Sequence, residues 1–418
     1  MRILLLAQRV PYPPHRGDKI ATYHYVRHLA RRHAVAVACL ADGRADLDNV
    51  AGLASLATSV DAVVCSPVRR RVRALAALAG NRPLTVAYFD EPELRARVRG
   101  RLAAERFDVA LVYGSGVAQF VEPFRDLPRV IQFSDLDSLK WADYAGATRP
   151  PRRWVYRTEA RRLLAYERRL AATSARSLVC SEREAAEFRR HIPGVPVDVV
   201  RNGVDLDRFR PADAAKDPHN LVFTGVMNYL PNVDGAVWFC REVWPRVRAE
   251  VPEATFTVCG SSPTPEVTAL GRLPGVTVTG AVPAVEPYLA KAGVGVIPVR
   301  IARGVQNKLL EAMAAGLPTV TTTAAGAGVE AADGRDLFVA DDPAEFAAAV
   351  VRLLRDGRLR DRVGRAARAA VEANYGWDRT LARLDEILDE AAGARARPVG
   401  ITSGGVTDGT PVSIGTPC

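Results

Sequence analysis

Short runs of apolar, often β-branched residues alternate along the chain with longer segments whose apolar positions recur every three to four residues. Continuous apolar runs are typical of strands covered on both faces, and the longer segments are typical of amphipathic helices. The alternation therefore predicts parallel sheets built from strand–helix–strand units. The thirteen predicted strands are residues 3–7, 35–40, 62–65, 109–113, 130–133, 178–180, 197–200, 221–224, 255–259, 276–279, 294–299, 319–322 and 337–340.

Thirteen strands are too many for one doubly wound sheet, and the polar segment 212–220 separates seven of them from the other six. We therefore predict an α/β protein of two Rossmann-like, doubly wound domains that face a cleft. The expected divisions are an N-terminal domain 1–203, a C-terminal domain 204–376, a helix 377–392 that packs back toward the N-terminal domain, and a disordered tail 393–418. Helices are also expected over 343–355 and 358–374.

The first strand leads into a loop that carries Arg16, Gly17 and Asp18, followed by a helix predicted over 20–32. Ligands of parallel sheets bind beyond the carboxyl ends of the strands, so this loop is a candidate site. Gly17 would let a ligand approach the backbone, and the free N–H groups of the helix start favour an anion or a polar transferring group. No GxGxxG motif or P-loop is present. A turn that binds nothing is the alternative.

A second loop and helix carry most of the candidate chemistry, within residues 297–318. We expect a strand that ends at Val299 and a helix that starts near Gly304 or Val305 and ends at Gly316. The loop between them holds Arg300 and Arg303, so guanidinium groups and a helix start together would stabilise a diphosphate.

Glu311 lies two turns into this predicted helix, where its carboxylate would accept hydrogen bonds from paired hydroxyls such as a ribose diol. Asn307 and Lys308 are assigned to the same nucleotide site. The alternative for Glu311 is a surface ion pair with Lys308, one turn away on the same helix.

A third candidate loop follows the strand predicted over 130–133 and contains Asp135, Asp137 and Lys140. Two carboxylates and a lysine at a strand end fit a site that orients acceptor hydroxyls or supports group transfer. Helix capping is an equally open interpretation for Asp137 and Ser138.

The charge of the chain is uneven, although the net charge is only +10. Residues 1–200 hold 33 basic and 21 acidic side chains, whereas the remainder holds 24 and 26. The basic stretch 149–170 and the cluster 69–73 would suit an anionic membrane that presents a lipid-linked acceptor, although 149–170 fits a packed helix with Leu163, Tyr166 and Leu170 inward equally well. No nucleic-acid motif accompanies the charge.

Six cysteines show no CxxC pair, and no HExxH motif or His/Cys cluster is present, which indicates neither a disulfide framework nor a bound transition metal. No apolar run approaches the length of a membrane span, and the first residues are too short for a signal peptide, so we expect a cytoplasmic protein.

The run from Gly304 through residues 311–320 (EAMAAGLPTV) resembles the donor-site signature of retaining GT-B glycosyltransferases of the group 4 type. Segments 201–205, 223–225 and 280–282 agree in order, and the resemblance covers about residues 1–392. More narrowly, segments 11–19, 135–141 and 227–232 resemble a branch associated with bacterial exosortase/PEP-CTERM exopolysaccharide systems.

The resemblance implies that Glu311 contacts the nucleotide ribose, that the backbone of Gly304 and Val305 faces the diphosphate and sugar, and that Gly17 lies at the interdomain transfer point. It implies the same donor site for Gly225. Two departures concern charged residues. The glutamate that usually precedes the ribose glutamate by eight positions is Arg303, and the usual Arg and Lys after the first strand of the second domain are Val226 and Asn232.

These departures make Arg300, Arg303 and Lys308 candidate replacements for the missing groups. A histidine common in the first-domain loop of the group is also absent, and Asp135 is the candidate substitute. We therefore assign Asp135, Gly17 and Arg303 as candidate catalytic residues, and Arg16, Asp18, Asp137 and Lys140 to the acceptor side.

The expected function is transfer of a sugar from a nucleotide-diphosphate sugar to an exopolysaccharide or lipid-linked acceptor, with retention of configuration. The donor is the expected co-substrate and no metal is expected, because no DxD motif is evident in a donor-site context; the DxD at 135–137 lies in the first domain. Two other functions fit the same sequence: a nucleotide-sugar epimerase, and a non-catalytic protein that binds carbohydrate or a membrane surface.

Overall fold

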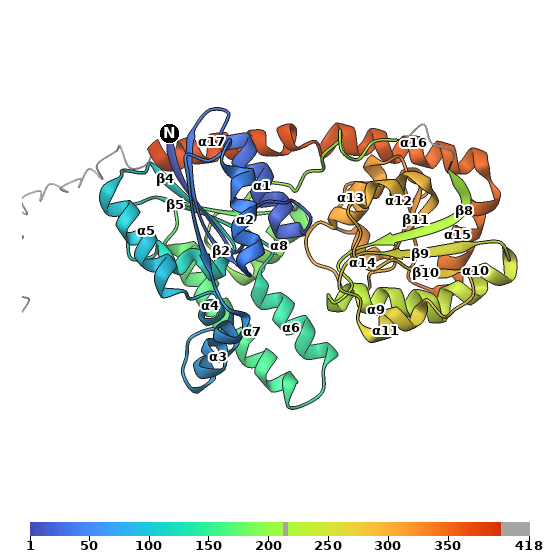
Figure 1. The fold of residues 1–418 in the computed structure, drawn as a ribbon, viewed down its shortest axis with the longest axis horizontal. Helices are drawn as coiled ribbons and strands as arrows, with labels where there is room; N and C mark the ends of the chain where they lie inside the picture. The colour runs from blue at the N-terminus through green and yellow to red at the C-terminus, as the bar shows by residue number, and fades with distance from the viewer. Residues whose placement is uncertain (212–215, 394–418) are drawn as a thin grey trace, which may run out of the picture.

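Two parallel β-sheets organise the chain in the computed structural model, which describes residues 1–211 and 216–393. The first sheet has the strand order β3-β2-β1-β4-β5-β6-β7, and the second has the order β10-β9-β8-β11-β12-β13 (Figure 1). Both are doubly wound, because the order reverses beside the first strand of each sheet. The prediction of two Rossmann-like parallel-sheet domains is confirmed.

All thirteen predicted strands form, within a few residues of their expected bounds. They are β1 Arg2–Ala7, β2 Ala34–Ala41, β3 Ser59–Val64, β4 Val109–Tyr113, β5 Arg129–Ser134, β6 Arg176–Val179, β7 Asp198–Val199, β8 Asp217–Thr224, β9 Thr255–Cys259, β10 Val276–Val278, β11 Ala292–Ile297, β12 Thr319–Thr321 and β13 Phe338–Val339.

Helices cover both faces of each sheet. Those of the first half are α1 Gly17–Leu29, α2 Arg44–Asp48, α3 Pro67–Ala76, α4 Leu84–Tyr88, α5 Pro92–Ala104, α6 Asp137–Ala147, α7 Arg152–Ala172 and α8 Glu182–His191. Those of the second half are α9 Leu230–Trp238, α10 Trp244–Glu250, α11 Pro265–Leu270, α12 Glu286–Lys291, α13 Asn307–Ala314, α14 Thr323–Gly326, α15 Pro343–Arg355, α16 Gly357–Asn374 and α17 Trp377–Gly393.

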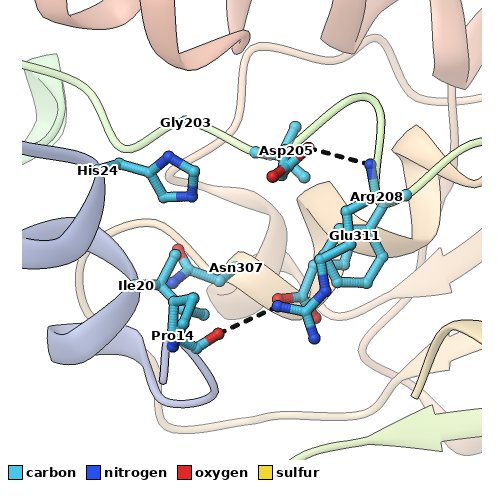
Figure 2. A pocket seen from close by; sticks show the side chains of 10 residues that line it. Pro14, Ile20, His24, Gly203, Asp205, Arg208, Asn307 and Glu311 are labelled. Atoms are coloured by element: carbon cyan, nitrogen blue, oxygen red, sulfur yellow. Dashed lines mark hydrogen bonds between the residues drawn. The ribbon is translucent and has the colours of Figure 1, made fainter. Parts of the chain in front are cut away.

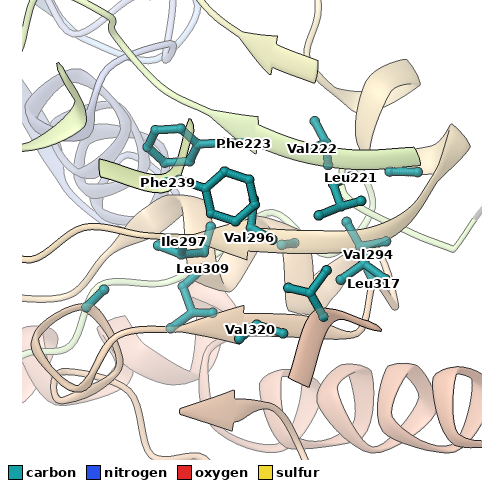
Figure 3. Close-up of a cluster of buried hydrophobic side chains, with 14 of the residues drawn as sticks. Leu221, Val222, Phe223, Phe239, Val294, Val296, Ile297, Leu309, Leu317 and Val320 are labelled. Carbon is teal, nitrogen blue, oxygen red and sulfur yellow. The ribbon is translucent and has the colours of Figure 1, made fainter. Parts of the chain in front are cut away.

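The side chains of β1 show why these apolar runs are strands. Ile3 and Leu5 join the cluster that contains α1 and α17, while Leu4 and Leu6 join the cluster on the opposite face. Such alternation buries every residue of the run, as a two-sided sheet requires. In the second domain one apolar cluster surrounds β8, β11 and β12, with Leu309 of α13 packed against the strands (Figure 3).

The last two helices run along the top of both domains in Figure 1. Helix α16 packs on α13, whereas α17 contacts α1, β4 and β5. The linker between the sheets passes beneath α17 so closely that a Cβ at Gly203 would lie 2.6 Å from the Trp377 ring. His24 stacks on the same ring at 4.5 Å, so α17 joins the C-terminal end of the chain to the first domain.

Three element bounds differ from the predictions for physical reasons. Strand β11 ends at Ile297 instead of Val299, because Pro298 has no N–H to continue the ladder. Helix α1 begins at Gly17 itself, so this glycine is the first helical residue and does not precede the helix. Helix α13 begins at Asn307, because Gly304 has a φ of +63°, a left-handed conformation that no α-helix contains.

Helix α7 confirms the packed-helix interpretation of the basic stretch: Leu163, Tyr166 and Leu170 are all buried. Within residues 1–211 and 216–393, no helix is long and apolar enough to cross a membrane. Five cysteines in these ranges are buried and free, whereas Cys418 lies outside them. Residues 394–418 of the predicted tail also lie outside the described residues.

Candidate functional site

The site lies where the two sheets present the carboxyl ends of their central strands to each other. The strand order reverses between β1 and β4 in one sheet and between β8 and β11 in the other. Loops that leave a sheet at such a point form a crevice in which ligands bind. The loop before α1 and the loop before α13 both leave their sheets here.

Figure 2 shows a pocket that three segments of the chain enclose. Its walls come from the start of α1 with the preceding loop, from the linker after Gly203, and from α13. Arg208 of the linker donates to the Pro14 carbonyl oxygen at 3.2 Å, while Asn307 and Glu311 face the pocket from α13. Gly17 and Asn307, which the sequence assigned to separate roles, lie close together, because a Cβ on Gly17 would lie 3.7 Å from Asn307 Nδ2.

Glu311 and Asp205 are the acidic residues that line this pocket, and Glu311 is the one that α13 supplies. Burial raises the pKa of its carboxyl to about 7, and the nearby cations Arg208 and Lys308 limit the rise. No ion pair joins Glu311 to Lys308 in the part of the chain that the structure describes, so the surface-pair alternative is wrong. A buried carboxylate without an ion-pair partner is suited to accept hydrogen bonds from ligand hydroxyls.

Lys308 points to the other side of α13, toward the loop after β8. Its Nζ donates to Asn232 Oδ1 and lies 5.2 Å from the centre of the Phe223 ring. A Cβ on Gly225 would lie 3.4 Å from the same Nζ and 2.8 Å from Asn232 Nδ2, so the glycine leaves this cation uncovered. Burial lowers the pKa of Lys308 to about 8.

This contact explains the missing cation after β8. Asn232 stands where a Lys or Arg is usual in the group that the sequence resembles, and the Lys308 ammonium touches its amide oxygen from the opposite helix. A positive charge therefore occupies the expected region although it comes from a different element.

The loop before α13 is tied to the first domain. Arg303 donates from Nη2 to Asp143 Oδ1 of α6 at 3.0 Å and from Nε to the other oxygen of the same carboxylate. The Gly304 N–H donates to Glu184 Oε1 of α8 at 3.2 Å, and Val305 is buried behind it. These contacts bring the loop before α13 against the first domain.

Glu184 was not predicted from the sequence, and its carboxylate accepts a hydrogen bond from the Gly304 backbone. Glu184 is only 2% exposed, and its backbone N–H donates to Ser181 Oγ at 3.2 Å. Its second oxygen, Oε2, is buried without a hydrogen-bond partner. A buried carboxylate oxygen that lacks a partner has unused acceptor capacity for a ligand hydroxyl.

The loop that carries Asp135 follows β5 in the first domain. Ser134 has a φ of +64°, which turns the chain sharply at the end of β5. Burial raises the pKa of Asp135 to about 6, and Lys140 opposes the rise. Lys140 Nζ lies 3.5 Å from Asp137 Oδ1, so one ammonium acts on both acidic groups of this loop.

Helix capping does not explain Asp137 or Ser138. Leu136 occupies the cap position, and its side chain makes no cap bond. The buried Glu167 of α7 instead accepts hydrogen bonds from the Ser138 N–H and hydroxyl. Glu167 thus fixes the start of α6 and the loop that carries Asp135.

Three other predicted residues are engaged in local ion pairs. Arg300 forms a two-point contact with Asp234, at 2.6 and 3.0 Å, and is not among the residues that line the pocket. Asp18 pairs with Arg9 at 2.5 Å, and Arg16 lies 3.4 Å from the same carboxylate. The structure therefore does not bring Arg300 to Glu311 or Lys308. No group of three or more His, Cys, Asp or Glu side chains suited to a metal ion occurs among residues 1–211 and 216–393.

Comparison with known proteins follows the two-sheet division. A family model described as Glycosyltransferase Family 4 matches residues 19–208, and one described as Glycosyl transferases group 1 matches residues 218–356. Among curated proteins, the D-inositol 3-phosphate glycosyltransferase 2 of Catenulispora acidiphila is 29% identical over 52% of this chain and 56% of its own length. That of Frankia alni is 32% identical over 44% and 50%. The matched regions thus span about half the length of these relatives.

Solved structures resemble the whole fold. The sucrose-phosphate synthase of Thermosynechococcus elongatus superposes with a TM-score of 0.73 over 94% of this chain and 100% of its own, at 15% identity. Anabaena HepE, solved in complex with UDP and glucose, gives a TM-score of 0.66 over 93% of this chain and 99% of its own, also at 15% identity. At this identity the likeness extends to the fold alone.

Proposed function

Because the chain belongs to the GT-B glycosyltransferases, with a family 4 domain followed by a group 1 domain, we propose that it transfers a sugar from a nucleotide-diphosphate sugar to an exopolysaccharide or lipid-linked acceptor. Retention of the anomeric configuration is part of the proposal. The observation that carries it is the pair of uncompensated ionisable groups on α13. Lys308 and Glu311 lie one turn apart, and burial disfavours the charge of both.

The donor would lie along α13. Its diphosphate would meet the Lys308 ammonium and the N–H groups at the start of the helix, and its ribose hydroxyls would donate to Glu311. Binding of the diphosphate would restore the charge of Lys308, because a nearby anion raises the pKa of an ammonium group. UDP is the first nucleotide to test, since HepE was solved with it.

The transfer breaks the bond between the anomeric carbon and the diphosphate oxygen and forms a bond to an acceptor hydroxyl oxygen. The electron pair of the broken bond leaves with the diphosphate, which Lys308 stabilises. The acceptor hydroxyl loses its proton, and Asp135, ionised above pH 6, is the proposed group to receive it. Retention requires the hydroxyl to arrive on the face from which the diphosphate departs.

Glu184 is the proposed replacement for the glutamate absent at position 303. Its unpartnered oxygen would accept a hydrogen bond from a hydroxyl of the donor sugar beside Gly304. We expect Glu184→Gln to weaken binding of the nucleotide sugar about tenfold and to leave nucleotide diphosphate binding unchanged. Calorimetric titration with both ligands measures the difference. Glu182→Gln, an exposed change on the same helix, is the control.

The proposal is tested by a thermal-shift panel of UDP, GDP, ADP, dTDP and their common sugars, followed by NMR of the product formed with a saccharide acceptor. A selective shift, and a glycosidic product with the anomeric configuration of the donor, are expected. An epimeric nucleotide sugar formed without acceptor would indicate an epimerase instead, and the absence of any shift would favour a carbohydrate-binding protein.

Metal independence and the exopolysaccharide acceptor stay predictions. The first is checked by adding a chelator, which we expect to leave the rate unchanged; recovery of lost activity with manganese would contradict it. The second rests on the resemblance of segments 11–19, 135–141 and 227–232 to the PEP-CTERM-associated branch.

A further inference from the structure

Helix α3 and the 3₁₀ turn Ala77–Ala79 that continues it expose their apolar side. Val68, Val72 and Leu75 are 67%, 59% and 64% exposed, and Leu78 is 37% exposed. Residues three and four apart share one face of a helix, so these four side chains form a continuous strip, called here the apolar strip of α3. No described residue buries it.

The opposite face of α3 bears arginine side chains that point into the protein. Arg70 is only 1% exposed; it donates to Asp42 Oδ1 at 2.6 Å and lies over the Tyr88 ring. Arg73, one turn later, donates to Glu91 Oε2 at 2.9 Å. The helix is thus inverted relative to an ordinary surface helix. Because rotation of α3 would take Arg73 from Glu91 and leave Asp42 with Arg9 alone, the ion pairs hold the apolar strip outward.

Cations surround the strip. Arg69 and Arg71 are exposed on α3, and residues 67–82 contain five arginines and no Asp or Glu. Helix α7 lies alongside, since Arg162 donates to the Ala77 carbonyl oxygen at 3.1 Å. It adds Trp154, which is 64% exposed, and the exposed residues Arg152, Arg157 and Arg161. Figure 1 shows α3 and the α6–α7 hairpin at the same lower end of the first domain.

We propose that this surface, the apolar strip of α3 with Trp154 and the arginines around them, docks on an anionic lipid membrane. Aliphatic side chains and a tryptophan would enter the interface, and the arginines would meet lipid phosphates. A second copy of the chain fits less well, because a two-fold contact places the same residues opposite each other and would oppose arginines to arginines. Of the two basic segments that the sequence offers to a membrane, the proposal thus uses α3, which holds the cluster 69–73, and only the first turns of the packed helix α7.

The surface is connected to the proposed acceptor site by α6. This helix begins at Asp137, beside Asp135, and its 11 residues rise about 16 Å toward the hairpin that carries Trp154. A membrane-bound enzyme would therefore hold its acceptor loop within reach of a headgroup. Only this connection rests on the proposed function; lipid binding itself does not.

The test is co-sedimentation of the full chain with vesicles of phosphatidylcholine plus phosphatidylglycerol, compared with phosphatidylcholine alone. We expect salt-sensitive binding to the anionic vesicles. The triple variant Val68→Ser, Val72→Ser, Leu75→Ser should bind at least about tenfold more weakly, because three apolar side chains no longer enter the interface. Arg69→Gln with Arg71→Gln should reduce both binding and its salt dependence. Leu273→Ser, 37% exposed on the second domain, is the matched control.

Failure of the wild-type chain to bind anionic vesicles, or equal binding by the triple variant, would overturn the proposal. Loss of a concentration-dependent dimer in the triple variant, measured by sedimentation without lipid, would also overturn it and assign the surface to a second copy. Nucleotide binding by the triple variant should equal that of the wild type, so failure of the membrane surface and failure of the donor site are distinguishable.

Discussion

Two pairs of opposite charges, one at the start of α1 and one on α13, are arranged in opposite ways. Arg9 and Asp18, in the first domain, contact each other at 2.5 Å; burial opposes the ionised carboxylate, but Arg9 and Arg16 outweigh it and hold the pKa of Asp18 below its usual value. Lys308 and Glu311, in the second domain, are not paired, and burial moves both pKa values toward the neutral forms.

This difference in pairing indicates that Arg9 and Asp18 stabilise the fold, whereas Lys308 and Glu311 are available to a ligand. A compensated pair stabilises the fold and has little capacity left for a ligand, whereas an uncompensated pair costs stability and gains it back when a ligand supplies the missing partners. Substitutions in the two pairs should therefore move stability and binding in different directions.

The largest expected effect concerns Lys308→Met. Loss of the ammonium should weaken binding of the nucleotide diphosphate about 100-fold, because a charge-assisted contact in a water-poor site is removed. Binding of the nucleoside without phosphates should stay unchanged. Calorimetric titration measures both, with Lys291→Met, an exposed change on α12, as the control. Equal losses for the two ligands would place Lys308 away from the phosphates.

The Arg9–Asp18 pair should respond through stability. Asp18→Asn leaves a partly buried guanidinium with one fewer counter-charge, and we expect a loss of about 1–2 kcal/mol in the free energy of unfolding at pH 7. Because the pKa of Asp18 is lowered by folding, this contribution is present above the unfolded pKa and disappears as the pH falls through the folded pKa. Urea unfolding at pH 7 and pH 3 measures it, with the exposed Asp48→Asn as reference.

Glu311→Gln, in contrast to Asp18→Asn, should raise the free energy of unfolding. The folded pKa of about 7 exceeds the unfolded value, so the wild type loses stability as the pH rises toward 7, and the amide avoids that loss. We expect the variant to be more stable by about 1–3 kcal/mol at pH 8, with the gain vanishing near pH 4, while nucleotide binding falls about tenfold. Thermal unfolding at both pH values measures the gain, and Glu345→Gln on α15 should show none. A destabilised Glu311→Gln would mean that this carboxylate is part of the scaffold.

The sequence predicted the strands and the donor helix because both are local patterns. Apolar runs identify buried strands, and Glu311 lies inside a contiguous run that resembles a known signature. Glu184 was missed because its contact with Gly304 spans 120 residues between two domains. A serine directly after a predicted strand, with Glu184 three residues later, signals a helix start there but not its neighbour across the cleft.

The cluster 69–73 is a second case in which a local sequence pattern does not reveal the contacts of its residues. Its arginines form a run of positive charge in the sequence. Arg70 and Arg73 nevertheless point into the protein, where they donate to Asp42 and Glu91. Only the fold shows which arginines are structural and which remain exposed for a partner.

The smallest expected effect is at the contact between Arg303 and Asp143, which joins the two domains. It adds a third ion pair to the comparison of the structural pair Arg9–Asp18 with the unpaired Lys308 and Glu311. Asp143 is 39% exposed, and exposed ion pairs are worth only about 0–1 kcal/mol, so Asp143→Asn should change nucleotide-sugar affinity by no more than about threefold. Arg303 has the opposite charge to the glutamate usual at its position, and Asp143 holds its guanidinium against the acceptor-side domain. If Asp143→Asn instead lowered the transfer rate tenfold or more with the donor affinity unchanged, the contact would be orienting Arg303 for the transfer step. Steady-state kinetics that separate kcat from KM decide between a surface contact that adds little and a positioning contact that belongs to the site.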